Sequence, residues 1–510
     1  MNLVKRKSKL LEECIVIFIV IFIFLAAAWV FSKLIERSIW LDEAMLLKNI
    51  EYSYEWLDYF KPLLFYDQVQ PAIITIFHNI IFHHISEDLI VFRLSMLLVM
   101  SLITIPFFVA LIKNKIEILL VLLIVYNFIF QIAFFFTEIK HYGFEVAACF
   151  LMIAAMYLGL MKRINFAFSV ISISIVAILG FSTLIPAFVM IVFLTIVEIR
   201  EDYKSFLKFQ NIIAVLISGI VGFLVLWNMK ELSLYQMNNY DAYLSRGFNE
   251  DLRVLLNLYI EIHSRTIALI VFFMLVVGLL SGKDGLYYKF TLVYIGIIFL
   301  VLIGKLSGFY PVAYSRHLAW LIPFAFIIIF LGFVYCRLGK SLIMKLIYFM
   351  LISILLLQAT KIFYRSIYDE NTEITSNNSL YKVLSEIKPS IVMVYPYAQP
   401  SLEYYMKVNP ELNKHKYIGI VEEVSSLKDG STLQRFKRRV DLDFYSVPDE
   451  RFIYLISHGE SIGGNDLYRG NDVYINYIVG KFKQSNCDYY AIYSGKRAQM
   501  LEVICHSNSR

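Results

Sequence analysis

The chain has 510 residues, of which 59% are apolar and only 17% are charged, with a formal net charge of +6. A soluble domain carries roughly 25% charged residues, so the composition excludes an ordinary soluble enzyme, a disordered chain and a small disulfide-rich protein. The basic residues stand in short clusters between apolar blocks, a pattern that orients membrane proteins and does not indicate nucleic-acid binding.

The apolar blocks are about twenty residues long, the length at which a helix crosses ~30 Å of hydrocarbon. The basic stretch Lys5–Lys9 precedes the first block, which is too long for a signal peptide and has no small-residue cleavage site after it. We therefore predict a polytopic α-helical membrane protein with about eleven transmembrane helices. The predicted spans are Cys14–Ser32, 89–112, 116–136, 142–161, 164–181, 184–199, 210–229, 265–282, 287–304, 318–336 and 341–359.

The basic residues also predict which side of the membrane each segment occupies. The segments assigned to the inside are short and basic, whereas 33–88, 230–264 and 305–317 are longer and poorer in bases. We expect a multi-pass protein of the cell (inner or plasma) membrane, with a cytoplasmic N-terminus and an extracytoplasmic C-terminal domain. The spans 164–181 and 184–199 lie so close together that they are alternatively a re-entrant pair, which would keep the same orientation.

The first outside segment, 33–88, contains two amphipathic stretches, Asp42–Phe65 and Pro71–Ile85, that we expect to lie on the membrane surface as helices. Asp42 and Glu43 are adjacent acids just outside the first span. A carboxylate half against lipid and half in water has a raised pKa that suits general-base work. Alternatively, the two acids have no catalytic role and only stabilise a helix N-terminus through their interaction with the helix dipole. Gln70, which precedes the second stretch, is a candidate substrate contact, and the alternative is that Gln70-Pro71 only starts this helix.

Basic residues gather at the outer ends of other spans. Lys140 and His141 follow Glu138 in a short turn after the third span, Arg93 lies one turn inside the second, and Arg316-His317 begin the tenth. A base at such a depth needs a partner, and arginine binds phosphate in a bidentate way. These residues would suit an anionic, lipid-linked ligand. The alternative is that they snorkel to water or anchor the protein at the membrane interface.

Two further groups carry weaker signals. Arg246, in the segment 230–264, is a candidate substrate contact. The histidines of His78-Asn-Ile-Ile-Phe-His-His84 do not place three ligands on one helix face, so they do not indicate a zinc site.

The composition changes near residue 360, so we predict a transmembrane domain over 1–360, which includes the loop 33–88, and a C-terminal domain over 361–510. Short strands alternate with helices in the second part, which predicts a small α/β domain outside the membrane. The predicted strands are Ser390–Tyr395, Phe452–Ser457 and Tyr489–Tyr493, and the helices are Leu380–Glu386, Leu402–Lys407 and Asn471–Lys481. Cys487 and Cys505 could form one disulfide there if the domain lies outside the cytoplasm.

Several short motifs occur in a characteristic order. They are Trp-x-Asp-Glu-Ala after the first span, Gln-Pro before the second surface helix, Arg93-Leu-Ser95, Glu-x-Lys-x-Tyr over 138–142, Arg-His before Leu318–Pro323, and Ala398–Tyr405. With this layout the chain resembles a membrane glycosyltransferase of the GT-C fold. The likeness is to bacterial relatives of the protein O-mannosyltransferases and of the lipid A aminoarabinose transferase.

The resemblance implies inverting transfer of a sugar (hexosyl or pentosyl) from a polyprenyl-phosphate-linked donor to a lipid, glycan or protein acceptor outside the cytoplasm. It assigns Asp42, with Glu43 beside it, as the base and Glu138 as a second acid near the acceptor or a metal. It also implies a donor-phosphate site and a tyrosine that contacts the substrate. The residues implied for the phosphate site are Arg93, Lys140, His141, Arg316 and His317. The tyrosine implied for the substrate contact is Tyr142. No clear metal-ligand set is present, so the cofactor is left open between none and a divalent cation at Glu138.

The sequence leaves two other classes of protein open: a lipid or glycan transporter (flippase), and a glycan ligase or polymerase. Transporters place charged groups and broken helices near the bilayer midplane, often in repeated halves. Here the charges gather at the outer ends of spans and no halves repeat. A ligase shares the lipid-phosphate chemistry but would be expected to lack the Asp-Glu pair after the first span.

Overall fold

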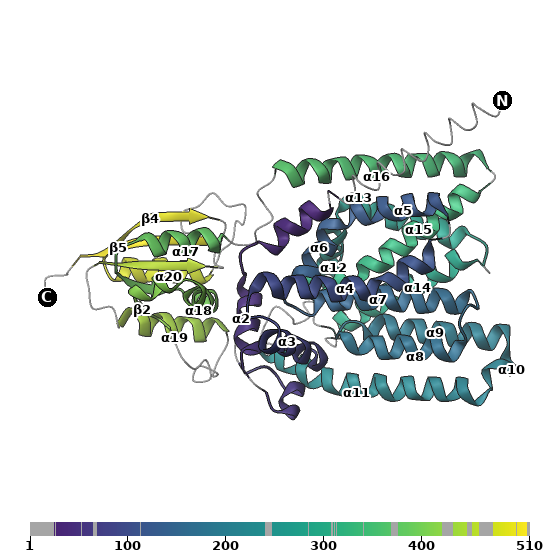
Figure 1. The fold of residues 1–510 in the computed structure, drawn as a ribbon, viewed down its shortest axis with the longest axis horizontal. Coiled ribbons are helices and arrows are strands. Elements are labelled where there is room, and N and C mark those ends of the chain that lie inside the picture. Colours follow the sequence, from purple (N-terminus) through teal and green to yellow (C-terminus); the bar gives the residue numbers. More distant parts are fainter. Residues whose placement is uncertain are drawn as a thin grey trace. The chain divides into compact units, whose positions relative to one another are not determined.

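The computed structural model describes residues 25, 27–52, 54–64, 69–112, 114–239, 247–283, 285–307, 310, 312, 314–339, 341–368, 376–420, 432–445, 451–457, 473–495 and 497–506. The chain divides into two compact units (Figure 1). The helical unit comprises Met1–Ile35, Tyr59–Lys61 and Gln70–Asp369, and the α/β unit comprises Glu36–Asp58, Pro62–Val69 and Glu370–Arg510.

The helical unit is built from α-helices and short 3-10 helices in chain order. They are α3 (Ala72–His84), α4 (Leu89–Leu111), α5 (Lys115–Asn127), α6 (Ile129–Thr137), α7 (Tyr142–Leu160), α8 (Phe166–Val176), η2 (Ala177–Leu179), α9 (Leu184–Glu201), α10 (Tyr203–Phe206), α11 (Phe209–Asn239), α12 (Phe248–His263), α13 (Arg265–Leu280), α14 (Leu286–Leu306), η4 (Ser315–Leu321), α15 (Ile322–Leu338) and α16 (Leu342–Tyr368).

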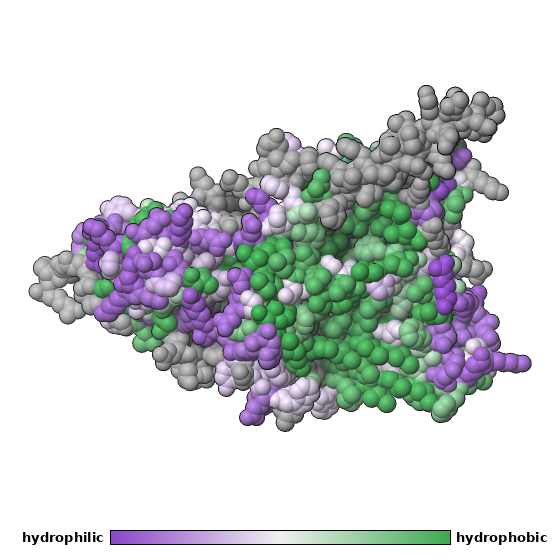
Figure 2. Space-filling model, in the orientation of Figure 1, coloured by the Kyte–Doolittle hydropathy of each residue, from purple (hydrophilic) through white to green (hydrophobic). Residues whose placement is uncertain are grey.

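Among the described residues, six helices are long and apolar enough to cross a membrane, or up to eight if each of two bent pairs is one span. The pairs are α5 with α6, bent by 67°, and α12 with α13, bent by 106°. Hydrophobic residues dominate the visible surface of this unit (Figure 2), as expected for helices that face lipid. The chain is therefore a multi-pass membrane protein. The first predicted span lies largely outside the described residues, so the count of eleven and the orientation stay predictions.

Two helices form the core of this unit. The apolar windows of α7 and of the stretch Ser315–Leu338, which contains α15, are 83% and 89% buried, whereas those of α11 and α16 are only 17% buried and belong to the periphery. Small residues along α7 permit this burial because they let neighbouring backbones approach closely. At Gly143, an added Cβ atom would lie 2.3 Å from the Phe135 carbonyl oxygen and 2.4 Å from the Met100 sulfur. Gly143 therefore sets the spacing of the first turn of α7 against α4 and α6.

The α/β unit contains a five-stranded sheet of order β2-β1-β3-β5-β4, parallel across β2, β1 and β3 and antiparallel across β3, β5 and β4. The strands are β1 (Ile391–Val394), β2 (Lys416–Ile418), β3 (Arg451–Ser457), β4 (Cys487–Gly495) and β5 (Ala498–Cys505). The helices are α2 (Leu41–Ile50), η1 (Trp56–Phe60), α17 (Asn377–Glu386), η5 (Pro396–Ala398), α18 (Gln399–Val408), η6 (Pro410–Lys414), α19 (Thr432–Tyr445) and α20 (Val473–Gln484).

The predicted α/β character of the C-terminal part is present, with more elements than the sequence patterns indicated. β2, α19 and β5 were not among the predicted elements. Cys487 and Cys505 stand opposite each other on β4 and β5 and form a disulfide. This covalent bond ties the two strands at the open end of the hairpin.

The boundary between the two units differs from the predicted division into 1–360 and 361–510. Residues 36–58 and 62–69 of the first loop group with the C-terminal part. The physical reason is that α2 packs on α18, where Lys48 lies 3.2 Å from Glu403. The predicted surface helix Asp42–Phe65 also ends earlier than expected, because α2 stops at Ile50 and the 3-10 helix η1 follows. The second predicted surface helix agrees with α3 to within one residue at each end.

Replacement of Gly143 by alanine should destabilise the helical unit, since the new methyl group has no room beside the Phe135 carbonyl. Overpacking of this kind costs about 1–3 kcal/mol. The measurement is the apparent melting temperature of the purified protein in detergent. Gly219→Ala in α11 is the matched control, because no described atom lies within 4 Å of the position of its Cβ. Equal melting temperatures for both variants would contradict this packing.

Candidate active site

The four-residue link between α6 and α7 carries three of the predicted site residues. Glu138, Lys140 and His141 are 0%, 5% and 8% exposed. Ionisable groups buried at the end of apolar helices are costly unless they are paired or serve a ligand. Because the link is short, these side chains stay at one end of α6 and α7.

The 3-10 helix η4 brings Arg316 and His317 to the same place. The His317 ring lies 5.9 Å from the Tyr142 ring, centroid to centroid. The Arg316 guanidinium carbon lies 6.0 Å from the Tyr142 ring centroid and 4.6 Å from that of Tyr314. Burial lowers the pKa of His141 well below its usual value, and the charges of Lys140, His317, Arg316 and His78 lower it further. We call Lys140, His141, Arg316 and His317 the basic cluster.

His141 is neutral in this setting, because its pKa is lowered and its ring is buried. Its Nδ1 atom has no hydrogen-bond partner among the described residues. A neutral imidazole keeps one N–H donor and one acceptor. His141 can therefore donate a hydrogen bond to an anion. Being neutral, it adds no third positive charge beside those of Lys140 and Arg316.

A buried hydrogen-bond network fixes η4 against α7. The Tyr310 hydroxyl lies 2.8 Å from Ser182 Oγ and 2.6 Å from the His317 carbonyl oxygen. The Trp320 indole N–H donates to both the Tyr310 oxygen and the His317 carbonyl, at 2.9 Å each. The Ser182 N–H in turn donates to Glu145 of α7 at 2.9 Å. The backbone at His317 is thereby held in place from α7.

Gln70 and His78 lie beside the basic cluster. Gln70 Nε2 donates to His78 Nδ1 at 2.9 Å, and His78 Nε2 faces the Met96 sulfur at 3.2 Å. Burial, and then the Lys140 charge, lower the pKa of His78 to about 3. His78 was considered at the sequence level only as a zinc ligand. Its position next to Lys140 is a tertiary feature that the pattern His78-Asn-Ile-Ile-Phe-His-His84 does not encode.

Arg93 of α4 is fully buried, and its Nη1 donates to the Ile35 carbonyl oxygen at 2.8 Å. The Arg93 guanidinium thus has a structural partner in Ile35, which lies just after the first predicted span. The role in phosphate binding that was predicted for Arg93 stays a prediction. Arg246 lies outside the described residues.

The two predicted acids of α2 have different environments. Glu43 is fully buried and forms an ion pair with Arg37 at 2.7 Å, so its carboxylate holds the fold of the α/β unit. Asp42 is half-buried in the first turn of the same helix. Of the two adjacent acids, Asp42 is the more exposed.

Among the described residues, no group of three or more His, Cys, Asp and Glu side chains is arranged to hold a metal ion. Glu138 shares its link with Lys140 and His141, and a basic neighbourhood disfavours a divalent cation.

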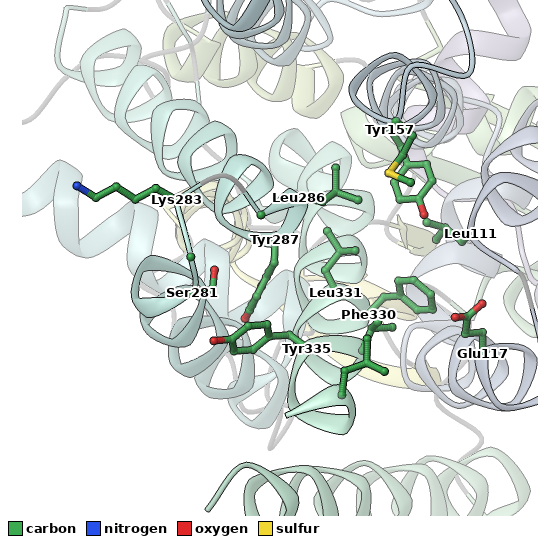
Figure 3. Close-up of a pocket in the computed structure, with 15 residues that line it drawn as sticks. Leu111, Glu117, Tyr157, Ser281, Lys283, Leu286, Tyr287, Phe330, Leu331 and Tyr335 are labelled. Atoms are coloured by element: carbon green, nitrogen blue, oxygen red, sulfur yellow. The ribbon is translucent and has the colours of Figure 1, made fainter. Parts of the chain in front are cut away.

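A cavity of about 470 Å³ lies at the other end of α7. Tyrosines 157, 287 and 335 line it together with apolar side chains such as Phe330 (Figure 3). Its lining residues include no member of the basic cluster. The candidate site is therefore the cluster of buried ionisable residues and not this cavity.

Comparison with solved structures finds ArnT from Cupriavidus metallidurans in the apo state, with a TM-score of 0.53 and 10% identity over 95% of this chain and 97% of that chain. A second structure, ArnT from Cupriavidus metallidurans bound to undecaprenyl phosphate, has a TM-score of 0.48 and 10% identity over 95% and 98% of the two chains. No protein-family model matches the sequence, and no curated protein matches it significantly.

The first comparison shows that this chain has the fold of ArnT, a GT-C glycosyltransferase, over nearly its full length. The predicted GT-C fold is thus confirmed. At 10% identity the likeness establishes the fold alone.

The buried His78 predicts how stability depends on pH. Its pKa is about 3 in the folded protein and 6.5 when exposed. The unfolded chain therefore takes up a proton that the folded chain does not, and stability is lost as pH falls from about 6.5 towards 3, by up to ~1.4 kcal/mol per pH unit. His78→Gln should make the apparent melting temperature less dependent on pH between 7 and 5.

The exposed His84 on the same helix provides the control. His84→Gln should leave the pH dependence of the wild-type protein in place, because an exposed ring keeps its hydration on folding. A pH dependence that is equally steep in His78→Gln and in the wild type would show that His78 is not buried in its neutral form.

Proposed function

We propose that this protein is an inverting glycosyltransferase that moves a sugar from a polyprenyl-phosphate-linked donor to an extracytoplasmic lipid, glycan or protein acceptor. The observation that carries the proposal is the basic cluster, in which Lys140, His141, Arg316 and His317 meet at one end of an apolar helical bundle. An amphipathic donor with a lipid tail and a phosphate matches such a site. The ArnT-like fold supports the same class of reaction.

The basic cluster suits the leaving group of this reaction. When the bond between the anomeric carbon and the phosphate oxygen breaks, negative charge grows on the phosphate. Lys140 and Arg316 supply positive charge there, and the imidazoles of His141 and His317 supply hydrogen bonds. Pre-arranged cations in a site with little water stabilise such charge strongly. Because phosphate is already a good leaving group, little acid catalysis is needed.

Asp42 supplies the other half of the proposed chemistry. Its carboxylate takes the proton of the acceptor hydroxyl while that oxygen bonds to the anomeric carbon and the polyprenyl phosphate departs from the opposite face. The half-buried position of Asp42 in the first turn of α2 supports this role, since such a carboxylate is both reachable and partly desolvated. Glu43 is then a partner of Arg37 rather than a second base.

The same proposal includes the sidedness of the chain, with a cytoplasmic N-terminus and the α/β unit outside. The disulfide between Cys487 and Cys505 supports it, because disulfides persist in oxidising compartments and are rare in the cytosol.

The function is tested by comparing a deletion strain with the same strain carrying the wild-type gene. Surface glycolipids, polymers and glycoproteins are extracted and analysed by mass spectrometry. The proposal expects one species to lose a single sugar mass in the deletion strain, and that mass and its carrier identify the sugar and the acceptor. A deletion strain with an unchanged profile, or one that accumulates the intact lipid-linked sugar on one side of the membrane, would contradict it.

Asp42→Asn should abolish complementation in this strain, because an amide cannot accept the acceptor's proton. Loss of a general base lowers the rate by roughly 10²–10⁴-fold. The readout is the amount of the sugar-bearing species, at equal protein level in the membrane. Asp58→Asn, in the 3-10 helix of the same segment, is the matched control and should complement fully. Normal product from Asp42→Asn would remove Asp42 as the base.

Arg316→Ala should weaken binding of the polyprenyl phosphate, since it removes one of the two permanent charges of the basic cluster. We expect roughly a tenfold rise or more in the dissociation constant, as a charge-assisted hydrogen bond contributes about 1.5–3 kcal/mol. The measurement is titration of the purified protein with undecaprenyl phosphate. Arg163→Ala, which removes an exposed charge at the other end of α7, is the control. Equal affinities for both variants would argue against a phosphate site at Arg316.

A further inference from the structure

The residues that precede α2 are buried inside the α/β unit. Ser38 is 2% exposed and Ile39 is fully buried. The helix N-cap position is Trp40, and an indole is not among the side chains that cap helix N-termini well. The first turn of α2, which carries Asp42, therefore depends on contacts from elsewhere in this unit for its position.

Two asparagines at the start of α17 provide the first of these contacts. Asn377 Nδ2 donates to the Ile39 carbonyl oxygen at 2.9 Å, and the backbone N–H of Asn378 donates to Ser38 Oγ at 3.0 Å. Asn377 is fully buried, and its Oδ1 accepts from the hydroxyl of Ser457, the last residue of β3, at 2.6 Å. The Asn377 amide thus links the end of a central strand to the chain three residues before Asp42.

A buried ion pair fixes the same turn from within the segment. Arg37 and Glu43 flank the first turn of α2, and both side chains are fully buried at a separation of 2.7 Å. This pair ties the chain entering the helix to the residue next to Asp42. Together with the bond from Asn377 to Ile39, it leaves the turn little freedom.

The other end of α2 is held by α18. Glu403 lies 3.2 Å from Lys48 and accepts from Gln399 Nε2 at 2.6 Å. Gln399 Oε1 in turn accepts from Arg439 Nη2 of α19 at 2.8 Å. A continuous polar chain thus runs from α19 through α18 to the last turn of α2.

From these contacts we infer that the α/β unit is the platform that positions Asp42, and that Asn377 is a positioning residue which acts through the Ile39 carbonyl. The inference deepens the proposed function and rests on it for the role of Asp42 as the base. It assigns to the α/β unit a part in the reaction that differs from selecting the acceptor or covering the site. Without Asn377 Nδ2, the buried Ile39 carbonyl loses a donor, and the segment leading to Asp42 can shift.

The test separates loss of this hydrogen bond from loss of the fold. Asn377→Asp has the same shape and keeps the oxygen that Ser457 contacts, but it removes the N–H group that holds Ile39. Ser385→Ala is the matched control, because it removes a hydroxyl near the other end of α17 whose bond is to the Lys382 carbonyl of the same helix.

Hydrogen–deuterium exchange of the full-length protein in detergent gives a readout that does not need the substrate. Loss of the Asn377 donor should raise exchange of α2 amides by roughly tenfold in Asn377→Asp, with peptides of β4 and β5 exchanging as in the wild type. Ser385→Ala should leave α2 unchanged. Unchanged exchange of α2 in Asn377→Asp, or equal loosening of α2 and β5 in both variants, would overturn the inference. If Asn377→Asp does not accumulate, Ser457→Ala is used, with the same expected direction.

The deletion-strain assay then distinguishes this inference from the proposed function. If the α/β unit positions Asp42 through Asn377 as inferred, Asn377→Asp should yield roughly tenfold less sugar-bearing product at equal protein level. If Asn377→Asp raises exchange of α2 but yields normal product, the positioning of α2 by Asn377 is supported and the role of Asp42 as the base is contradicted. If Asn377→Asp loses product but leaves α2 exchange unchanged, the positioning of α2 by Asn377 is contradicted and the transferase function is not.

Discussion

Burial of charge at the end of an apolar helical bundle is the constraint on which the site depends. Lys140 and His141 have almost no contact with water, and both stand in a link of four residues between two apolar helices. Charges in such a place are retained only where a partner or a ligand offsets their desolvation. The nearby Arg316 adds a further charge at the same place, and the donor phosphate of the proposed function would offset part of this cost.

Each of the two units has its own buried contacts that hold a residue of the proposed reaction. In the helical unit, the tightly packed α7 and the bonds of Tyr310 hold the backbone beside Arg316. In the α/β unit, Asn377 and the pair of Arg37 with Glu43 hold the turn of Asp42. In both units, buried neutral groups and ion pairs hold the backbone beside a residue to which the proposed function gives a role.

Much of this organisation could be predicted from the sequence, because apolar blocks and strand–helix alternation are local patterns. The meeting of Lys140-His141 with Arg316-His317 followed from their common position at span ends. The pairing of Glu43 with Arg37, the position of His78 beside Lys140 and the grouping of α2 with α18 did not, since each is a tertiary contact that local periodicity does not encode. The bends within the bundle are likewise set by packing, so apolar length alone does not give the number of spans.

Release of free polyprenyl phosphate is the measurement that tests the central claim most directly. The purified full-length protein is incubated in detergent with a lipid extract of its own cells, and the polyprenyl lipids are quantified by mass spectrometry. Transfer breaks the bond between sugar and phosphate, so we predict that polyprenyl phosphate rises as one lipid-linked sugar falls. A flippase leaves that bond intact. A lipid-linked sugar pool that stays unchanged, with acceptor lipids present, would contradict the account.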